Sequence, residues 1–254
     1  MPSRKSLRKE PNAYQILVAR ILPVLQKIHG SDDASLQQCL TEEDVRSLIS
    51  DVKALFWFTL SRAGVNDDVI RMMSTKFHDA GRRSPPWQAG SARGTFRRPQ
   101  DGADGNRQRR WLFPTEHKFY AGEIVATLTE VRFYFQTLSM DGAPHLQGNE
   151  LRDPAIPILG HPLEPGKFLD PISKLPVKFT DFVQDRRAVE SGHIIPLGSE
   201  LDGVRGRHNV QNATLMLRDS NRIQADMTVP ELMQMFEGIL RRHGYSVVPP
   251  RPPS

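Results

Sequence analysis

The apolar residues of this 254-residue chain follow two different periods, and the change between them limits the folds that the chain can adopt. Over residues 13–80, and again after residue 115, apolar side chains recur every three or four positions, which is typical of helices that bury one face. From residue 167 onward, short apolar runs alternate with turn residues, as they do in strands. We therefore predict an α+β protein with a helical N-terminal region, residues 11–145, and a smaller C-terminal domain, residues 165–244.

Capping signals predict where several helices begin and end. Thr41 followed by Asp44 is a variant of the capping box, which satisfies two free N–H groups at a helix start. Thr228 and Glu231 form a second capping box before an amphipathic run, and Gly244 is a suitable residue to end that helix. The chain is therefore expected to close with a short, well-capped helix.

Between these helices the pattern is weaker. Thr115 is predicted to cap a helix, and residues 141–166, rich in Gly and Pro, are expected to form a linker or an irregular extension. Residues 168–169 and 177–179 read as two short strands around a Pro-containing turn.

Residues 81–110 differ sharply from the rest of the chain. They contain eight arginines, no lysine and only two acidic residues, and they lack apolar periodicity. We predict a long loop or basic arm that contacts the phosphate backbone of a nucleic acid; the alternative is a solubilising loop. The arginines expected to make these contacts are Arg97, Arg98, Arg109 and Arg110.

Composition excludes several other classes of protein. The formal charge of +5 and the pI of about 9.5 favour an acidic partner. A single cysteine, Cys39, rules out an internal disulfide and a zinc site made of cysteines, so no structural zinc is expected and a cytoplasmic location is the simplest expectation. No apolar run reaches the length of a membrane span, so no membrane partner is expected.

The chemistry-bearing residues lie in the C-terminal domain. His193 ends an apolar, strand-like run and is followed by Ile-Ile-Pro, Asn212 comes 19 residues later, and Asn221 begins a helix-like run 9 residues after that. A neutral histidine is a suitable base near physiological pH, and asparagine oxygen suits a hard divalent cation. Hydrolysis of a phosphodiester needs both of these groups, together with positive groups that hold the backbone.

This spacing resembles the HNH nucleases, whose active site is a ββα-metal fold. The resemblance covers about residues 167–243 and includes Asp226 and Thr228 after Asn221-Arg222, with Ala225 where the family usually has Gly. It implies that His193 is the general base, that Asn212 braces the loop carrying the base, and that Asn221 is a metal ligand. It also implies one Mg²⁺ or Mn²⁺ per active site.

Two departures from the family pattern matter. Many members have Asp before the histidine as a second metal ligand, whereas this chain has Gly192. Glu190 is the candidate replacement, because residues two apart on a strand point to the same face. The zinc-binding cysteines of many members are also missing, with Leu217 and Ser220 in their places.

Four further arginines lie close to these motifs in the sequence and are expected to hold phosphates: Arg205, Arg207, Arg218 and Arg222. The resemblance then implies a metal-dependent HNH endonuclease that cuts double-stranded DNA, of the type II restriction or phage-defence kind. The N-terminal region would recognise the target or form a homodimer, although a monomer that nicks one strand fits the same residues. Two alternatives are a catalytically decayed HNH-fold protein that only binds DNA, and an HNH nuclease directed at RNA.

Overall fold

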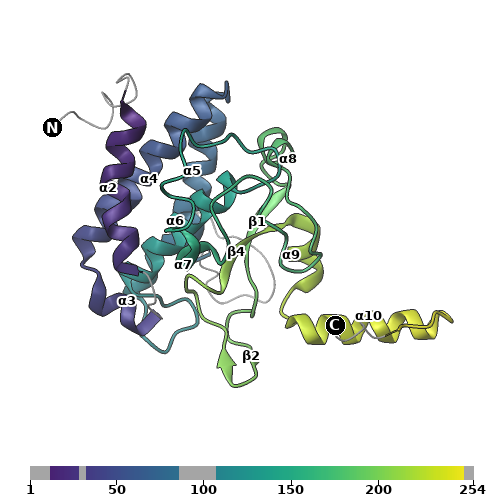
Figure 1. Cartoon of the computed structure of the whole chain (residues 1–254). Coiled ribbons are helices and arrows are strands. Elements are labelled where there is room, and N and C mark those ends of the chain that lie inside the picture. The colour runs from purple at the N-terminus through teal and green to yellow at the C-terminus, as the bar shows by residue number, and fades with distance from the viewer. Residues whose placement is uncertain (1–11, 29–32, 86–106, 249–254) are drawn as a thin grey trace, which may run out of the picture.

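The structure is a computed structural model that describes residues 12–28, 33–85 and 107–248. It combines many helices with two small antiparallel sheets, so the protein is α+β (Figure 1). No helix within the described ranges is long and apolar enough to cross a lipid bilayer. The elements in chain order are α2 (Ala13–Ile28), α3 (Asp33–Cys39), α4 (Glu42–Arg62), α5 (Asp67–Arg82), η2 (Arg110–Leu112), α6 (Glu123–Leu138), α7 (Ile156–Leu159), α8 (Phe179–Gln184), β1 (Val189–His193), β2 (Glu200–Leu201), β3 (Val204–Arg205), β4 (Ala213–Leu217), α9 (Arg218–Gln224) and α10 (Val229–Arg242).

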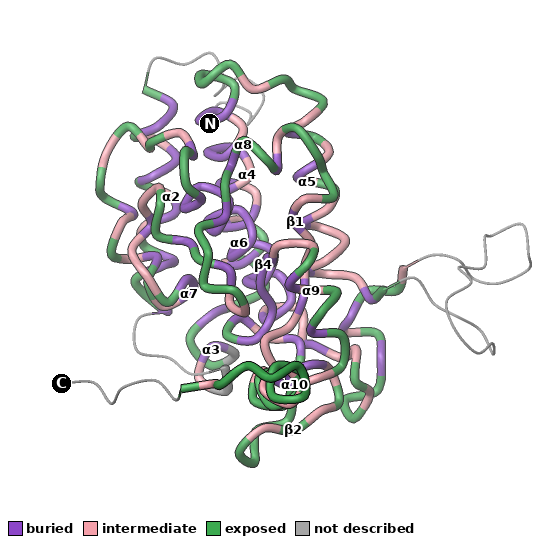
Figure 2. Tube along the Cα trace, turned by 90° about the vertical axis from the view of Figure 1, so that its right-hand side faces the viewer, coloured by how far each residue is buried: buried purple, intermediate pink, exposed green. Residues whose placement is uncertain are grey.

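Helix α6 is the centre of the molecule. It packs against α4 and α5 on one side and against β4 on another, and nearly all of its residues are buried (Figure 2). The helix predicted from Thr115 in fact begins at Glu123, because Gly122 takes an extended backbone conformation at the N-cap and residues 115–120 form turns. The one-sided apolar pattern also understates its burial, since partners lie on several faces.

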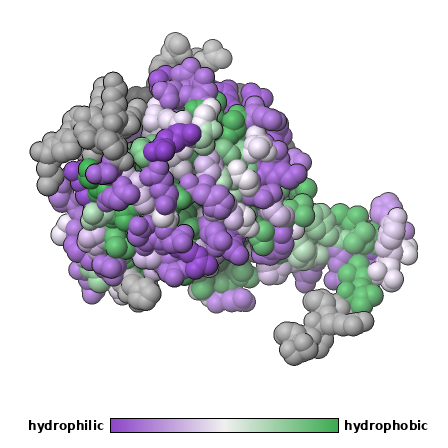
Figure 3. All heavy atoms as spheres, turned by 45° about the horizontal axis from the view of Figure 1, so that its top comes forward, coloured by the Kyte–Doolittle hydropathy of each residue, from purple (hydrophilic) through white to green (hydrophobic). Residues whose placement is uncertain are grey.

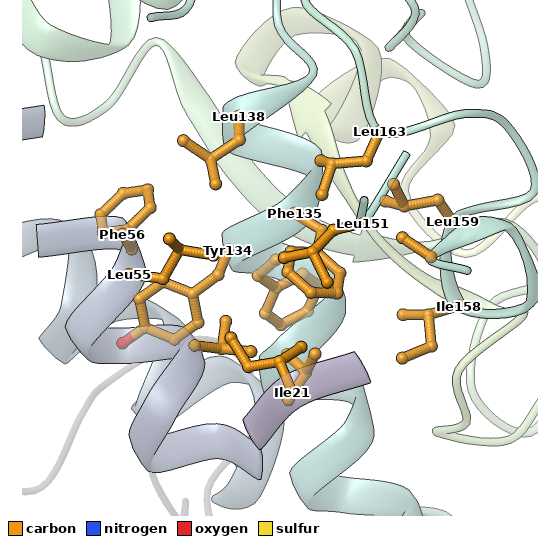
Figure 4. Close-up of a cluster of buried hydrophobic side chains, with 14 of the residues drawn as sticks. Ile21, Leu55, Phe56, Tyr134, Phe135, Leu138, Leu151, Ile158, Leu159 and Leu163 are labelled. Atoms are coloured by element: carbon orange, nitrogen blue, oxygen red, sulfur yellow. The ribbon is translucent and has the colours of Figure 1, made fainter. Parts of the chain in front are cut away.

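One hydrophobic core runs through both predicted regions. Figure 4 shows Phe56 of α4 beside Tyr134 of α6, with Ile21 of α2 and Phe135 of α6 in the same cluster and Leu151 and Ile158 on its far side. Residues 141–166 are mostly irregular, as one of the two expectations has it, but they are not a linker. They carry α7 and several buried side chains, because Gly and Pro here shape tight turns that fold the segment onto α6.

The strands form a ββα unit on this core. Strands β1 and β4 pair antiparallel, with Val189 opposite Leu217 and His193 opposite Ala213, and α9 follows β4 directly. The hairpin of β2 and β3 lies in the connection between them.

The strands predicted at 168–169 and 177–179 are largely wrong. Only a single bridge, Leu169 to Pro176, joins them, and Phe179 begins α8 instead. The pairing ends there because the backbone N–H of Phe168 donates to Ser139 and the carbonyl oxygen of Val177 accepts from Asp141, so neither group is free to extend the ladder.

The predicted caps are confirmed. Thr41 and Asp44 form a reciprocal capping box at α4, and Thr228 and Glu231 do the same at α10. Gly244 has a positive φ of 81° just after α10, a conformation that favours glycine.

Two buried polar side chains hold β4 against the helical core. The Gln136 amide of α6 donates to the Thr214 hydroxyl at 2.8 Å and accepts from the backbone N–H of Leu215 at 3.0 Å. Asp170, fully buried, accepts from the backbone N–H of Leu217 at 2.8 Å. Strand β4 is thus held from both sides of the predicted boundary, by Gln136 of the helical region and by Asp170 of the turn at 170–175.

Candidate active site

A cleft of about 1050 Å³ lies between α5 and the ββα unit. His193 and Glu190 of β1 and Asn221 of α9 all line it, so the fold brings three of the predicted site residues to one surface. Helix α5 forms the opposite wall. The cleft is thus shared between the two predicted regions of the chain.

His193 is the first member of a hydrogen-bonded chain that ends in the helical region. Its Nε2 lies 3.0 Å from Nδ1 of His208, and Nε2 of His208 lies 2.8 Å from the carbonyl oxygen of Gly81, near the end of α5. His208 is buried, whereas His193 remains partly exposed to the cleft.

The order of donors in this chain follows from its last member. A carbonyl oxygen only accepts, so Nε2 of His208 carries the proton and donates to Gly81. In a neutral imidazole the other nitrogen is then an acceptor, so Nε2 of His193 donates to Nδ1 of His208. The Nδ1 of His193 then has a lone pair that no described residue uses, and this nitrogen can accept a proton.

Burial keeps both imidazoles neutral. It lowers the pKa of His193 to about 3, with a smaller contribution from the Arg110 charge. Burial also lowers the pKa of His208 well below its ordinary value, and the charges of Arg110 and His193 act in the same direction.

Sequence reasoning did not assign a role to His208. It lies 15 residues from His193, and its carbonyl partner lies 127 residues away, so no local pattern connects the three. A histidine within the loop between the two motif segments was the only available signal.

Asn212 lies behind this loop rather than in the cleft. Its side chain accepts from the backbone N–H of Ile195 at 2.7 Å and donates to the carbonyl oxygens of Ile195 and Arg207, each at 2.8 Å. These bonds join the segment after His193 to the segment before His208, so Asn212 holds the backbone that carries both histidines.

Glu190 and Asn221 form a second polar pair. The Asn221 amide donates to Glu190 Oε2 at 2.9 Å, and Arg222 lies 4.0 Å from Glu190 Oε1. A Cβ added at Gly192 would meet the Asn221 Oδ1 at 2.5 Å and would also meet the Met216 sulfur. The space that an aspartate would use is therefore taken by the Asn221 side chain.

The chain matches no protein-family model and no curated protein sequence. Several solved chains are similar to it. One of them, described as the crystal structure of a type II restriction endonuclease, is 17% identical over 74% of this chain and 82% of its own chain, with a TM-score of 0.48.

The prediction that Arg110 contacts a nucleic acid is wrong. Arg110 is buried, and its guanidinium donates to the carbonyl oxygens of Gly81 and Ala80, each at 3.1 Å, and of Phe119 at 3.4 Å. Carbonyl groups in the last turn of a helix lack partners within the helix, and a buried cation satisfies those of α5. Arg110 thus supports the same helix end that holds His208.

The rest of the predicted arm is described only at its base. There the backbone N–H of Ser84 donates to the carbonyl oxygen of Gln108 at 2.8 Å, and Arg109 is exposed with its guanidinium 5.4 Å from the Trp111 ring. Arg97 and Arg98 lie outside the described residues.

The four arginines near the motifs do not line the cleft. Arg205, Arg207 and Arg222 are exposed and Arg218 is partly buried, although Arg222 lies 4.0 Å from Glu190, which does line the cleft.

Other cations do line the cleft. Arg186 and Arg187, before β1, and Lys118 reach it without an ion pair among the described residues. Lys76 of α5 also lines it, where burial lowers its pKa and its ammonium donates to the carbonyl oxygens of Arg186 (2.7 Å) and Val189. Only the folded structure brings these residues to the same cleft as the histidines.

Proposed function

We propose that this protein is a metal-dependent nuclease of the ββα-metal (HNH) type that hydrolyses phosphodiester bonds in double-stranded DNA. The observation that supports it best is the His193–His208–Gly81 hydrogen-bond chain, which leaves a proton-accepting nitrogen of His193 free in a cleft that also holds Glu190 and Asn221. The proposed biological role is restriction or phage defence.

In this proposal His193 is the general base. Its Nδ1 accepts a proton from water as the water oxygen bonds to phosphorus, and the bond from phosphorus to the leaving oxygen then breaks. His208 is a positioning residue that keeps the proton of His193 on Nε2. Arg186, Arg187 and Lys118 would hold the backbone phosphates at the cleft.

A single Mg²⁺ or Mn²⁺ fits the oxygen donors of Glu190 and Asn221. No cluster of three His, Cys, Asp or Glu side chains is placed to hold a metal in the described part of the chain, so water would complete the shell, as Mg²⁺ allows. When bound, the ion would stabilise negative charge on the phosphorus centre and on the leaving oxygen.

The first experiment is cleavage of supercoiled plasmid by the purified protein and its His193→Ala variant, with Mg²⁺, Mn²⁺ or EDTA. We expect cutting by the parent alone, abolished by EDTA, and a loss of about 10²-fold or more in the variant. Discrete fragments would support sequence-specific restriction, and nicked circles would support a nickase.

Other outcomes favour the alternatives. Tight, salt-sensitive DNA binding without cleavage would favour a decayed HNH-fold binding protein. Preferential cleavage of RNA, or strong competition by RNA, would favour an RNA-directed enzyme. Unchanged cutting by His193→Ala would refute the proposed base.

A further inference from the structure

Helix α10 projects from the body of the protein. Its first turn is closed by the Thr228–Glu231 capping box, and Leu232, which is fully buried, anchors it to the body. Beyond Leu232 the helix extends away from every other described element (Figures 1 and 2). It is therefore held firmly at one end and free along most of its length.

The exposed part of α10 carries an apolar face. Met235, Phe236, Ile239 and Leu240 recur at helical spacing, and Figure 3 shows apolar surface along the projection. Met235, Ile239 and Leu240 are 37–41% exposed. A helix of 14 residues is marginally stable in water without tertiary packing, so this face needs a partner.

The charges beside this face indicate what the partner is. Glu231 and Arg242 are eleven residues apart, about three helical turns, so they flank the apolar face on the same side at opposite ends. Glu231 uses Oε2 for its cap, and Arg242 makes no ion pair among the described residues. A second α10 running antiparallel would bring Arg242 of each copy to Glu231 of the other.

We propose that α10 is a homodimerisation element that pairs antiparallel with α10 of a second copy. The midpoint between Glu231 and Arg242 falls beside Phe236, about one residue from the middle of the exposed apolar face from Met235 to Leu240. One two-fold axis at that point therefore satisfies both the charges and the apolar side chains, as a self-complementary interface requires. This inference does not rest on the proposed nuclease activity.

The first test measures the mass of the full chain in solution by light scattering after size exclusion. We expect twice the monomer mass of 28.7 kDa for the parent, and the monomer mass for Ile239→Glu. The matched control is Gln234→Glu, which adds the same charge on the opposite face of the helix and should remain a dimer. Circular dichroism should show that each variant keeps its folded body.

A second test measures orientation by oxidative cross-linking in a Cys39→Ser background. Phe236→Cys, beside the axis, should form a disulfide between copies. His243→Cys should not, because antiparallel pairing places the two cysteines about 20 Å apart.

Several outcomes would overturn the proposal. A parent that is monomeric excludes it, and a weakened DNA affinity in Ile239→Glu would then assign the face to nucleic acid. An Ile239→Glu variant that stays dimeric would place the interface elsewhere. Cross-linking by both cysteine variants would indicate a parallel pair.

Discussion

At the scale of single residues, the proposed chemistry depends on which nitrogen of His193 carries the proton. The Gly81 carbonyl fixes the tautomer of His208, and His208 in turn fixes the tautomer of His193. His208, which is not part of the recognised motif, therefore controls the proposed base. The hydrogen bond made by one ring nitrogen commonly determines the tautomer of a functional histidine.

Two substitutions of His208 each keep only one of its two hydrogen bonds, the one to His193 or the one to Gly81. Asn can place an oxygen where Nδ1 accepts from His193, whereas Gln can place an N–H where Nε2 donates to Gly81. We expect His208→Gln to lower kcat by about 10²-fold with little change in KM, because the wrong tautomer of His193 is then allowed, and His208→Asn to retain more activity. Equal loss in both variants, at equal stability, would contradict the tautomer argument.

The buried histidines also predict how stability depends on pH. In the folded protein the pKa of His193 and of His208 lies below the unfolded value of about 6.5, so below that pH the unfolded chain binds more protons. The free energy of unfolding should therefore fall as the pH drops from 6.5 to 5, by up to about 1.4 kcal/mol per pH unit for each histidine. Urea unfolding followed by circular dichroism at several pH values measures this.

The His208→Asn substitution should reduce the pH dependence of the free energy of unfolding by the contribution of one histidine. The matched control is His243→Asn, since His243 is exposed, and its slope should equal that of the parent. A parent whose stability is flat from pH 6.5 to 5 would contradict the neutral, buried state of the pair.

At the scale of elements, the packing of α9 on β1 explains why the chain has Gly192 where the HNH pattern that it resembles often has Asp. Asn221 of α9 lies over Gly192 of β1, where a side chain would collide with it. Glu190, two residues earlier on the same face of β1, instead reaches the Asn221 amide. Strand and helix are thus closer at this point than an aspartate would allow.

We therefore expect Gly192→Asp, which makes the motif more like the family, to reduce activity rather than raise it. Overpacking of this kind costs about 1–3 kcal/mol of stability. Thermal unfolding and plasmid cleavage measure the two effects, and the stability cost should shrink in an Asn221→Ala background because the amide is gone. A Gly192→Asp protein that is more active and equally stable would show that aspartate fits.

At the scale of the whole molecule, one core joins the helical region to the ββα unit, and the cleft lies where they meet. The base of the basic arm, closed by the Ser84–Gln108 hydrogen bond, is at the rim of the same cleft through Pro85 and Arg107. We propose that the arm adds phosphate contacts to those of the cleft.

A double variant, Arg97→Gln with Arg98→Gln, tests whether the basic arm contacts phosphates. If both arginines bind phosphates, the slope of log affinity against log salt should become shallower by about 0.9 for each phosphate that is no longer neutralised, with unchanged thermal stability. Fluorescence anisotropy with a DNA duplex measures the slope. Arg62→Gln, exposed on α4 and outside the cleft lining, removes a charge elsewhere and should leave the slope unchanged.

Features that depend on local interactions could be predicted from the amino-acid order alone. The α+β class and the helix caps at Thr41 and Thr228 follow from side chains that contact their own neighbours, and these were predicted. The spacing of His193 and Asn221 could also be recognised in the sequence, because both residues lie on one ββα unit whose strands pair within a short stretch of chain.

The other features needed the folded chain, because they depend on contacts between distant segments. Residues 141–166 pack on α6, which is buried on several sides, so they belong to the core and do not form a linker. The carbonyl groups at the end of α5 accept hydrogen bonds from Arg110, which is therefore buried, and from His208. Such groups are satisfied by whatever residue the fold brings to them, and no spacing in the sequence records which one that is.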